Sequence, residues 1–339
     1  MTKIAVVGAT GAVGSVMLQC LRERGLDADN EIVLFATERS AGRVIDGRTV
    51  QALNDQADLS GFDIALFSAG GGTSKEWAPR FVQAGATVID NSSAFRRDPE
   101  VPLVVSEVNL HALRSHRGLI ANPNCSTMQL MVALAPIHRE AGIERMVVST
   151  YQSVSGTGQK AVEALNAEAE ADLHGRQMPA PEIYPENIAF NVIGAAGNFA
   201  EGDDHTDEER KMMFETRKIL EAESIGVAVT CVRVPVRISH SEAVNIQTRE
   251  PLSVERAREL LAEAPGLILE DVPSPLRAAG RDEVFVGRLR ADESHPRALS
   301  MFVVADNLRK GAATNAVQIA EILLREGIVS AADATAAAA

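Results

Sequence analysis

A glycine-rich turn near the N-terminus constrains the fold of this chain more than any other feature. Residues 4–7 form a continuous apolar run typical of a buried parallel strand, and Gly8-Ala9-Thr10-Gly11-Ala12-Val13-Gly14 follows directly. Helical spacing then continues through Leu21. This order of strand, glycine-rich turn and helix is typical of dinucleotide-binding domains, in which the backbone approaches the pyrophosphate and the helix N-terminus supplies N–H groups. The spacing is GxxGxxG rather than GxGxxG, so the prediction also depends on the position of the turn within an α/β pattern.

The end of the second predicted strand, residues 31–35, bears on the choice of cofactor. At this place a carboxylate binds the ribose 2′-hydroxyl of NAD, or a basic group binds the 2′-phosphate of NADP. Arg39, with Thr37 and Ser40 beside it, favours NADP. Glu38 would reverse that preference if it faced the ribose, and an ordinary solvated turn is the other interpretation.

Two further predicted strands run into polar loops. Residues 63–67 lead to a glycine-rich loop at 68–72, which is placed to lie over the ribose and pyrophosphate. Residues 86–90 lead to a polar turn at 91–97 that carries two arginines. Open α/β sheets bind ligands beyond the carboxyl ends of their strands, so Arg96 is a candidate anion ligand, and a solvated arginine is the alternative.

One cysteine lies in a polar turn directly before an apolar run with helical spacing. The turn is Asn122-Pro123-Asn124-Cys125-Ser126-Thr127. Unpaired N–H groups and the positive end of the helix dipole meet at such a junction, and both favour the nucleophilic thiolate. Most free cysteines are instead small buried hydrophobes, but the flanking asparagines and hydroxyls argue against a core position. We therefore predict that Cys125 is a nucleophile and that the first domain ends at about residue 125.

Beyond residue 125 the pattern changes to strands that follow one another. A strand is predicted at residues 146–151, a helix at 160–173 and irregular chain at 174–204. Consecutive strands are then predicted at 227–236, 243–249, 283–289 and 299–305, with a helix at 253–262 between them. Such a run predicts a mostly antiparallel sheet with one face covered by helices or by a second subunit. Thr206-Asp207-Glu208-Glu209 is a capping box that opens a helix, and a C-terminal helix at 311–324 is predicted to return to the first domain. The alanine-rich residues 331–339 are predicted to fray.

Charge and cysteine content exclude several classes of protein. The net charge is −13, from 33 basic and 46 acidic residues without a basic run, so no nucleic-acid partner is expected. No apolar stretch is long enough to span a bilayer and the N-terminus is not a signal peptide, so no membrane partner is expected. Three dispersed cysteines and seven scattered histidines form neither a disulfide framework nor a metal pattern. These features indicate a cytoplasmic protein without a structural metal.

A thiolate beside a nicotinamide cofactor implies thioester chemistry on an acyl group, which needs an acid/base and a substrate anchor. His240 stands just past the predicted strand at 227–236 among polar neighbours, and imidazole suits proton transfer. Arg233 interrupts an apolar strand, where it would bind a substrate carboxylate or form an internal salt bridge. Glu208 and Lys211, three residues apart on a predicted helix, would ordinarily be a surface pair.

Taken together, eight segments resemble the aspartate-β-semialdehyde dehydrogenase family in the family's order, over nearly the whole chain. They are GATGAVG at 8–14, RSAG at 39–42, SSAFR at 92–96, NPNCST at 122–127, YQSVSGTG at 151–158, EERK at 208–211, RVPVRISH at 233–240 and DNLRKGAA at 306–313. The resemblance implies an α/β protein with a Rossmann-like NADP-binding domain at residues 1–125 plus 311–330. It also implies an α+β catalytic and dimerisation domain at 126–310, with a mostly antiparallel sheet, and hence a homodimer.

The resemblance further assigns roles to individual residues. Cys125 looks like the nucleophile, Gln152 like the side chain that orients the acyl group, and His240 like the general acid/base. The candidate substrate ligands are Arg233 for the α-carboxylate, Arg96 and Lys211 for phosphate, Glu208 for the amino group, and Asn124 beside the cysteine. The candidate cofactor contacts are Gly8, Thr10, Gly11, Ala12 and Val13 at the pyrophosphate, Thr37, Arg39 and Ser40 at the 2′-phosphate, Ser68 and Gly70 in the following loop, and Ser155, Gly156 and Asn307 near the nicotinamide.

The implied reaction is the NADPH-dependent conversion of β-aspartyl phosphate to aspartate semialdehyde and phosphate, in the biosynthesis of lysine, threonine and methionine. The alternative is N-acetyl-γ-glutamyl-phosphate reductase, whose Gly-Cys-Tyr context differs from Asn124-Cys125-Ser126. Short-chain dehydrogenases and sugar epimerases need Tyr-x-x-x-Lys, but Tyr151 is followed four residues later by Ser155 and Tyr184 by Ile188. A non-catalytic nucleotide sensor is the third possibility.

Overall fold

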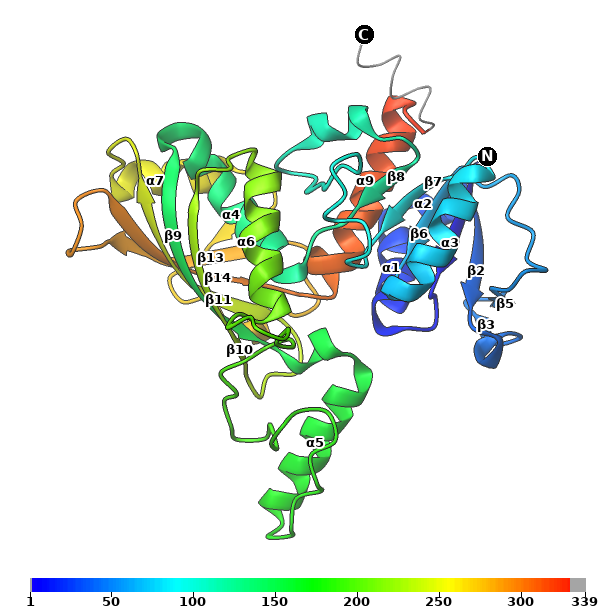
Figure 1. Ribbon diagram of the computed structural model, residues 1–339, viewed down its shortest axis with the longest axis horizontal. Coiled ribbons are helices and arrows are strands. Elements are labelled where there is room, and N and C mark those ends of the chain that lie inside the picture. Colours follow the sequence, from blue (N-terminus) through cyan, green and yellow to red (C-terminus); the bar gives the residue numbers. More distant parts are fainter. Residues whose placement is uncertain (1, 330–339) are drawn as a thin grey trace. The chain divides into compact units, whose positions relative to one another are not determined.

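The structure is a computed structural model that describes residues 2–329 and divides into two compact units (Figure 1). Of the described residues, unit 1 contains 2–124 and 312–329, and unit 2 contains Cys125–Gly311. The tail predicted to fray, 331–339, lies outside the described residues.

Unit 1 is a parallel sheet with the strand order β5-β2-β1-β6-β7-β8. The strands are β1 (Lys3–Val7), β2 (Glu31–Ala36), β5 (Gln51–Ala52), β6 (Ile64–Phe67), β7 (Thr87–Asp90) and β8 (Leu119–Ala121), with a small hairpin of β3 (Val44–Ile45) and β4 (Arg48–Thr49). The helices are α1 (Ala12–Glu23), α2 (Leu26–Asp29), α3 (Gly71–Gln83) and α9 (Thr314–Glu326). This order is that of the doubly wound dinucleotide-binding fold, as the N-terminal motif predicted.

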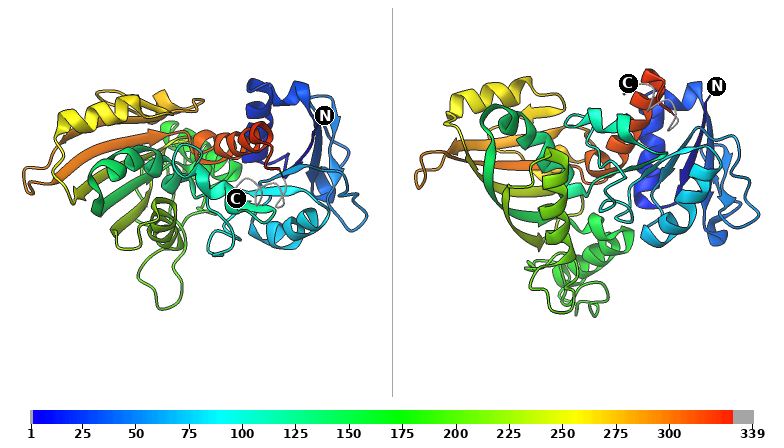
Figure 2. Two further views of the ribbon diagram at one scale, coloured as in Figure 1. Left: turned by 90° about the horizontal axis from the view of Figure 1, so that it is seen from above. Right: turned by 45° about the horizontal axis from the view of Figure 1, so that its top comes forward.

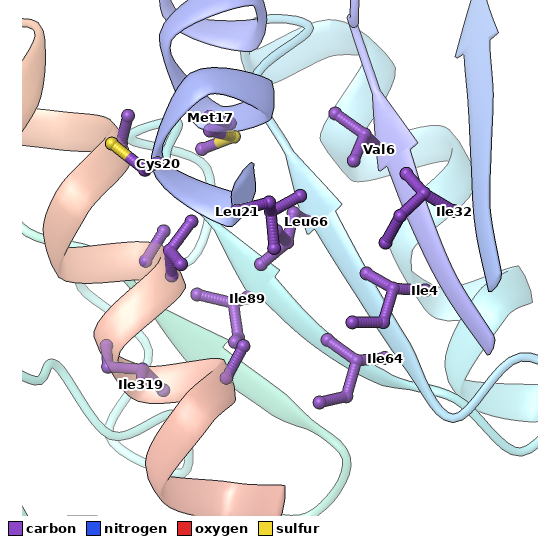
Figure 3. Close-up of a cluster of buried hydrophobic side chains, with 14 of the residues drawn as sticks. Ile4, Val6, Met17, Cys20, Leu21, Ile32, Ile64, Leu66, Ile89 and Ile319 are labelled. Carbon is purple, nitrogen blue, oxygen red and sulfur yellow. The ribbon is translucent and has the colours of Figure 1, made fainter. Parts of the chain in front are cut away.

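Both faces of this sheet are covered because strand residues alternate between two cores. Ile4 and Val6 of β1 point to the face covered by α1 and α9, which lie side by side (Figures 2 and 3). Ala5 and Val7 point to the opposite face, where α3 contributes Phe81. The C-terminal helix thus belongs to the core of the N-terminal sheet, as predicted.

Two glycines of the N-terminal turn are required by close backbone contacts. A Cβ on Gly14 would lie 2.1 Å from the carbonyl oxygen of Gly8, where α1 begins beside β1. Gly8 has a φ of 87°, and a Cβ there would lie 2.9 Å from the carbonyl group of Ser68. The turn is therefore packed too tightly for side chains at these positions, which brings the start of α1 close to the ends of β1 and β6.

Unit 2 contains a six-stranded sheet in the order β10-β9-β11-β14-β13-β12. The strands are β9 (Ile143–Gln152), β10 (Gly226–Arg233), β11 (His240–Thr248), β12 (Leu267–Leu269), β13 (Val284–Ala291) and β14 (Ala298–Ala305). The inner pairs are antiparallel, but the outer pairs β9–β10 and β12–β13 are parallel. The sheet is mixed, so the prediction of a mostly antiparallel sheet is not exact. Both parallel pairs, β9–β10 and β12–β13, are joined by connections that contain helices, and a long crossover allows parallel pairing.

A helix layer covers one face of this sheet. The helices of unit 2 are α4 (Cys125–Ala141), α5 (Gln159–Leu173), α6 (Asp207–Leu220), α7 (Val254–Glu263) and α8 (Pro275–Ala278). Helices α4, α6 and α7 pack against the strands, and α4 also packs against α6 and against α7 (Figures 1 and 2). The predicted capping box is confirmed, since Thr206 accepts from the Glu209 backbone and Glu209 accepts from the Thr206 backbone. On the other face, the Tyr151 ring is 38% exposed and lies 6.1 Å from the Phe302 ring.

Neither a membrane span nor a metal cluster is present in residues 2–329. In that range, every helix is too short or too polar to cross a bilayer. Over the same residues, no group of three or more His, Cys, Asp or Glu side chains is arranged to hold a metal ion.

Candidate active site

Candidate catalytic residues of unit 2 meet at one edge of its sheet because of the directions of the strands. The parallel strands β9 and β10 end at Gln152 and Arg233, which are register partners. Strand β11 is antiparallel to β9 and begins at His240, so this residue lies at the same edge. Strand β14 ends opposite His240 and leads to Asn307. If β10 were antiparallel to β9, Gln152 and Arg233 would lie at opposite ends of the sheet.

Cys125 is the first residue of α4 and its side chain is partly exposed. At this position the first-turn N–H groups and the helix dipole favour the thiolate. The turn that carries Gly311 lies against it, since a Cβ on Gly311 would be 2.8 Å from the Cys125 Cβ. Cys20 and Cys231 are buried, and burial raises the pKa of Cys231. Cys125 alone among the three cysteines therefore has the surroundings of a nucleophile.

His240 is fully buried and its tautomer is determined by one backbone contact. The N–H of Ser153 donates to Nδ1 of His240 at 3.0 Å. Because that N–H can only donate, Nδ1 carries no proton and the neutral ring has its proton on Nε2. Nε2 is buried without a hydrogen-bond partner among residues 2–329, and a Cβ on Gly156 would lie 3.2 Å from it. Burial lowers the pKa of His240 well below its usual value, and the charge of Arg233 adds to this effect. His240 is therefore a neutral N–H donor.

A polar network centred on Asn307 supports the backbone on both sides of His240. The Asn307 Oδ1 accepts from the hydroxyls of Ser153 and Ser155, each at 3.1 Å, and from the backbone N–H of Ser239 at 2.9 Å. Ser239 has a left-handed backbone with a φ of 79°, which costs of order 1–3 kcal/mol in a residue other than glycine. Ser155 and Asn307, which were predicted to contact the nicotinamide, thus belong to the hydrogen-bond network around His240.

Arg233 is buried with only part of its guanidinium satisfied. Nη1 donates to the carbonyl oxygen of Ser153 at 2.7 Å, whereas Nε is buried and has no partner among the described residues. Within residues 2–329, no carboxylate lies within ion-pair distance of Arg233, so the alternative of an internal salt bridge is not observed. A buried cation of this kind requires an anion, which a substrate carboxylate would supply.

Glu208 and Lys211 are connected to the sheet edge and are more than an isolated surface pair. The amide of Gln152 donates to Glu208 Oε1 at 3.4 Å. Lys211 donates to Glu208 Oε2 at 3.3 Å and to Asp207 at 2.6 Å. Burial acts to lower the pKa of Lys211, but the two carboxylates outweigh it and the pKa is raised. Lys211 is therefore a charged ammonium, and Glu208 links it to Gln152.

Glu242 is a second buried titratable group, two residues after His240 on the same face of β11. Burial raises its pKa well above the usual range, and Gln129 is the side chain that faces it. Gln129, one turn along α4 from Cys125, donates to the His240 carbonyl oxygen at 3.4 Å. In the described part of the chain, neither Glu242 oxygen nor the Gln129 Oε1 has a partner. A proton on Glu242 would allow its hydroxyl to donate to the Gln129 Oε1.

Replacement of Glu242 by glutamine is expected to stabilise the protein, increasingly as the pH rises. The native state binds the Glu242 proton more tightly than the unfolded chain does. Protonated Glu242 therefore stabilises the native state fully below about pH 4.5, and this contribution is lost as the pH rises above that value. Glutamine keeps a donor for Gln129 but cannot ionise. Above that pH the free energy of unfolding of the natural protein falls by up to about 1.4 kcal/mol per pH unit, until Glu242 ionises in the native state. Thermal midpoints of both proteins at pH 5 and pH 8.5 test this. A constant difference between them would contradict it.

The candidate cofactor residues in unit 1 surround the turn that precedes α1. Helix α1 begins at Ala12, and Gly11 before it supplies no capping side chain. The Thr10 and Ser40 hydroxyls lie 3.5 Å apart, which brings the glycine-rich turn to the end of β2. Ser68 donates to the Val7 carbonyl oxygen at 3.2 Å. Gly70 is the N-cap of α3 with a φ of 85°. A backbone cradle at a helix N-terminus is the arrangement that pyrophosphate requires.

The structure also shows where the side chains at the end of β2 are directed. Thr37 and Arg39 are exposed, whereas Ser40 is buried. The Glu38 carboxylate accepts from the side-chain amide of Asn54 at 3.2 Å, so its contact in this structure is with a neighbouring loop. Arg39 remains the exposed cation at this point.

Two candidate substrate ligands belong to unit 1. Arg96 is buried and donates to the Asn91 carbonyl oxygen at 2.9 Å. Asn124 is buried and is the last residue of unit 1 before Cys125.

Sequence analysis mislocated one residue and missed three others. His240 was predicted to follow a strand ending at 236, but β10 ends at Arg233 and His240 is the first residue of β11. Ser153, Glu242 and Gln129 were not recognised. Strand alternation would have placed Glu242 on the face of His240, and helical periodicity would have placed Gln129 one turn after Cys125. Nothing in the local sequence indicates the contact of Ser153 with His240, because the two are far apart in the chain.

Unit 1 has the sheet of a dinucleotide-binding domain. Unit 2 has a thiol at a helix N-terminus and a buried imidazole. These features together define the class of NAD(P)-dependent dehydrogenases that act through a cysteine. Comparison with known proteins agrees with this class. Residues 3–116 match the domain family described as semialdehyde dehydrogenase, NAD binding domain, and residues 134–310 match semialdehyde dehydrogenase, dimerisation domain.

Relatives over the full length identify the family. The aspartate-semialdehyde dehydrogenase of Aquifex aeolicus is 53% identical, over 96% of this chain and 99% of the relative. That of Streptomyces akiyoshiensis is 51% identical, over 96% and 99%. The crystal structure of aspartate semialdehyde dehydrogenase II from Vibrio cholerae, complexed with ASA, is 47% identical and superimposes with a TM-score of 0.92, over 96% of this chain and 99% of that chain. The chain belongs to the aspartate-semialdehyde dehydrogenase family.

Proposed function

We propose that this protein catalyses the NADPH-dependent reductive dephosphorylation of β-aspartyl phosphate to L-aspartate 4-semialdehyde and phosphate. The product serves the biosynthesis of lysine, threonine, methionine, isoleucine and diaminopimelate. The observation that carries the proposal is the sheet edge of unit 2, where a neutral imidazole, a partly unsatisfied guanidinium and Gln152 meet. The chain also belongs to a family whose members bear this enzyme's name.

In the first step of this proposal, the Cys125 thiolate attacks the acyl carbon of β-aspartyl phosphate. A carbon–sulfur bond forms, the carbon–oxygen bond to phosphate breaks, and inorganic phosphate leaves with the bonding electrons. Arg96 and Lys211 bind the phosphate, and Asn124 lies beside the nucleophile. Gln152 orients the acyl group, and Glu208 binds the substrate ammonium. Arg233 binds the α-carboxylate.

In the second step, the thioester carbonyl is reduced. NADPH, when bound, supplies the hydride. The Nε2–H of His240 donates a hydrogen bond to the oxyanion of the resulting tetrahedral adduct. Collapse of this adduct re-forms the carbonyl group, breaks the carbon–sulfur bond and releases the aldehyde and the Cys125 thiolate. The Ser153 N–H supports this role of His240, because it keeps the proton of the neutral ring on Nε2.

The residues of unit 1 fit NADP(H). We propose pyrophosphate contacts in the glycine-rich turn with Ser68 and Gly70 beside them, and a 2′-phosphate site at Thr37, Arg39 and Ser40. The contact of Glu38 with Asn54 supports Arg39 as the determinant. Ser155, Gly156 and Asn307 are the proposed residues near the nicotinamide.

We further propose that residues 1–125 with 311–330 act as the NADP-binding domain and 126–310 as the catalytic and dimerisation domain of a homodimer. The match to a dimerisation domain and the exposed Tyr151 on the open sheet face support the dimer. The dispersed cysteines support a cytoplasmic location.

An absorbance assay in the reverse direction tests the function. We expect phosphate-dependent reduction of NADP with aspartate semialdehyde, slower reduction with NAD, and no reaction with N-acetylglutamate semialdehyde. Activity with the acetylated aldehyde alone would assign the protein to the reductase of the alternative family. Inactivity with both aldehydes would exclude the proposed function.

A further inference from the structure

The Arg233 guanidinium is only partly hydrogen-bonded within the described part of the chain. Its Nη1 donates to the Ser153 carbonyl oxygen at 2.7 Å, and its Nε is buried without a partner in the described part of the chain. A planar fork binds a carboxylate with two parallel hydrogen bonds only when its plane is correctly oriented. The orientation of the guanidinium plane therefore determines how well this cation can bind a carboxylate.

The backbone of Arg233 forms hydrogen bonds with the irregular segment between α5 and α6. Ile193 and Arg233 exchange both of their backbone hydrogen bonds, at 2.9 and 3.0 Å. Ala196 donates to the Cys231 carbonyl oxygen at 2.8 Å. The irregular chain between α5 and α6 thus lies along the edge of β10 where Arg233 ends the strand.

The same segment places an aromatic ring over the guanidinium. The Tyr184 ring centroid lies 5.8 Å from Cζ of Arg233, within the range of a cation–π contact. The Tyr184 hydroxyl lies 2.9 Å from the Thr157 hydroxyl, directly after Gly156. The body of the ring packs on the small core that includes Val154 and Ile188. Tyr184 is therefore anchored at its body and at its hydroxyl, and its position relative to Arg233 is restricted.

We infer that Tyr184 is a positioning residue that orients the Arg233 guanidinium for the α-carboxylate of the amino-acid substrate. The inference rests on the proposed function and deepens it, because it assigns part of the substrate specificity to a residue outside the sheet edge. The ring supplies the orientation and the hydroxyl contributes less, since the contact with Arg233 is made by the ring. Loss of the ring leaves the charge in place but allows the fork to turn.

The test is a set of variants assayed with aspartate semialdehyde, phosphate and NADP. Tyr184→Leu and Tyr184→Met remove the ring, and Tyr184→Phe keeps it while removing the hydroxyl. We expect the ring-less variants to raise KM for aspartate semialdehyde about 10-fold, with kcat and the KM for phosphate within twofold of the natural protein. Tyr184→Phe should raise the KM for the aldehyde less than threefold. Phe190→Leu, which changes an exposed aromatic of the same segment, is the matched control and should leave both KM values unchanged.

The outcomes separate this inference from the proposed function. Inactivity of the natural protein with aspartate semialdehyde overturns the function itself. If the natural protein is active, three results overturn the inference: an unchanged aldehyde KM in both ring-less variants, an equal rise in the phosphate KM, or a Tyr184→Phe loss as large as that of Tyr184→Leu. Thermal midpoints identify a variant that fails to fold, and the second ring-less variant then decides.

Discussion

Replacing Cys125 by serine is expected to lower kcat by about 10⁴-fold or more, because this position needs an ionised nucleophile. The start of α4 favours the thiolate over the thiol, but it cannot ionise a serine hydroxyl. His240 cannot compensate as a base, since its Nδ1 is occupied by the Ser153 N–H and Nε2 carries the proton. The measurement is the steady-state rate of NADP reduction with saturating aspartate semialdehyde and phosphate.

Two controls make this result specific. NADP affinity, measured by fluorescence titration, should remain near that of the natural protein, because the proposed cofactor residues at the 2′-phosphate and pyrophosphate belong to unit 1. Cys231→Ala is the matched variant in unit 2, where burial raises the pKa of the thiol, and it should keep most of the activity. A serine variant with more than a few per cent of the natural rate would exclude the thioester mechanism.

Replacing Arg233 by lysine is expected to raise KM for aspartate semialdehyde about 30- to 100-fold, while KM for phosphate changes little. Lysine keeps the charge but loses the planar fork, and a hydrogen bond to a charged group contributes about 1.5–3 kcal/mol. Lysine also gives up the contact with the Ser153 carbonyl oxygen, and Ser153 is the residue whose N–H donates to His240. Some loss of kcat is therefore expected as well.

Arg237→Lys is the matched control for this variant. Arg237 lies four residues further on, is exposed and donates to Asn166 at the surface. It should leave both KM values unchanged. Equal increases in KM for the aldehyde and for phosphate in the Arg233 variant would remove the proposed role of Arg233 as the carboxylate clamp.

Much of unit 1 could be predicted because its signals are local. The strand before Gly8, the turn and the helix after it are consecutive in the chain, and the close contact of Gly14 with Gly8 explains why the motif needs glycine. The pattern of apolar strands separated by helices likewise predicts parallel pairing. The prediction that Cys125 opens a helix was confirmed for the same reason, since turn, cysteine and helix are neighbours.

The strand pairing of unit 2 could not be predicted from local sequence signals. The sequence suggested a mostly antiparallel sheet, because its strands follow one another without clear helices between most of them. The connection between β9 and β10 contains α5 and α6, and that crossover makes the two strands parallel neighbours. The pairing of Gln152 with Arg233 depends on this crossover, and no property of either residue reveals it.

The sequence by itself determined the fold class, the family and the identity of the chemically competent side chains, because residue type and spacing carry that information. The tertiary structure decided what those side chains can do. It placed the proton of His240 on Nε2 through the Ser153 backbone, buried Glu242 against Gln129, and set Tyr184 over Arg233. Each of these contacts joins residues that are distant in the chain or on different elements, and their energies depend on burial and distance, which only the folded chain defines.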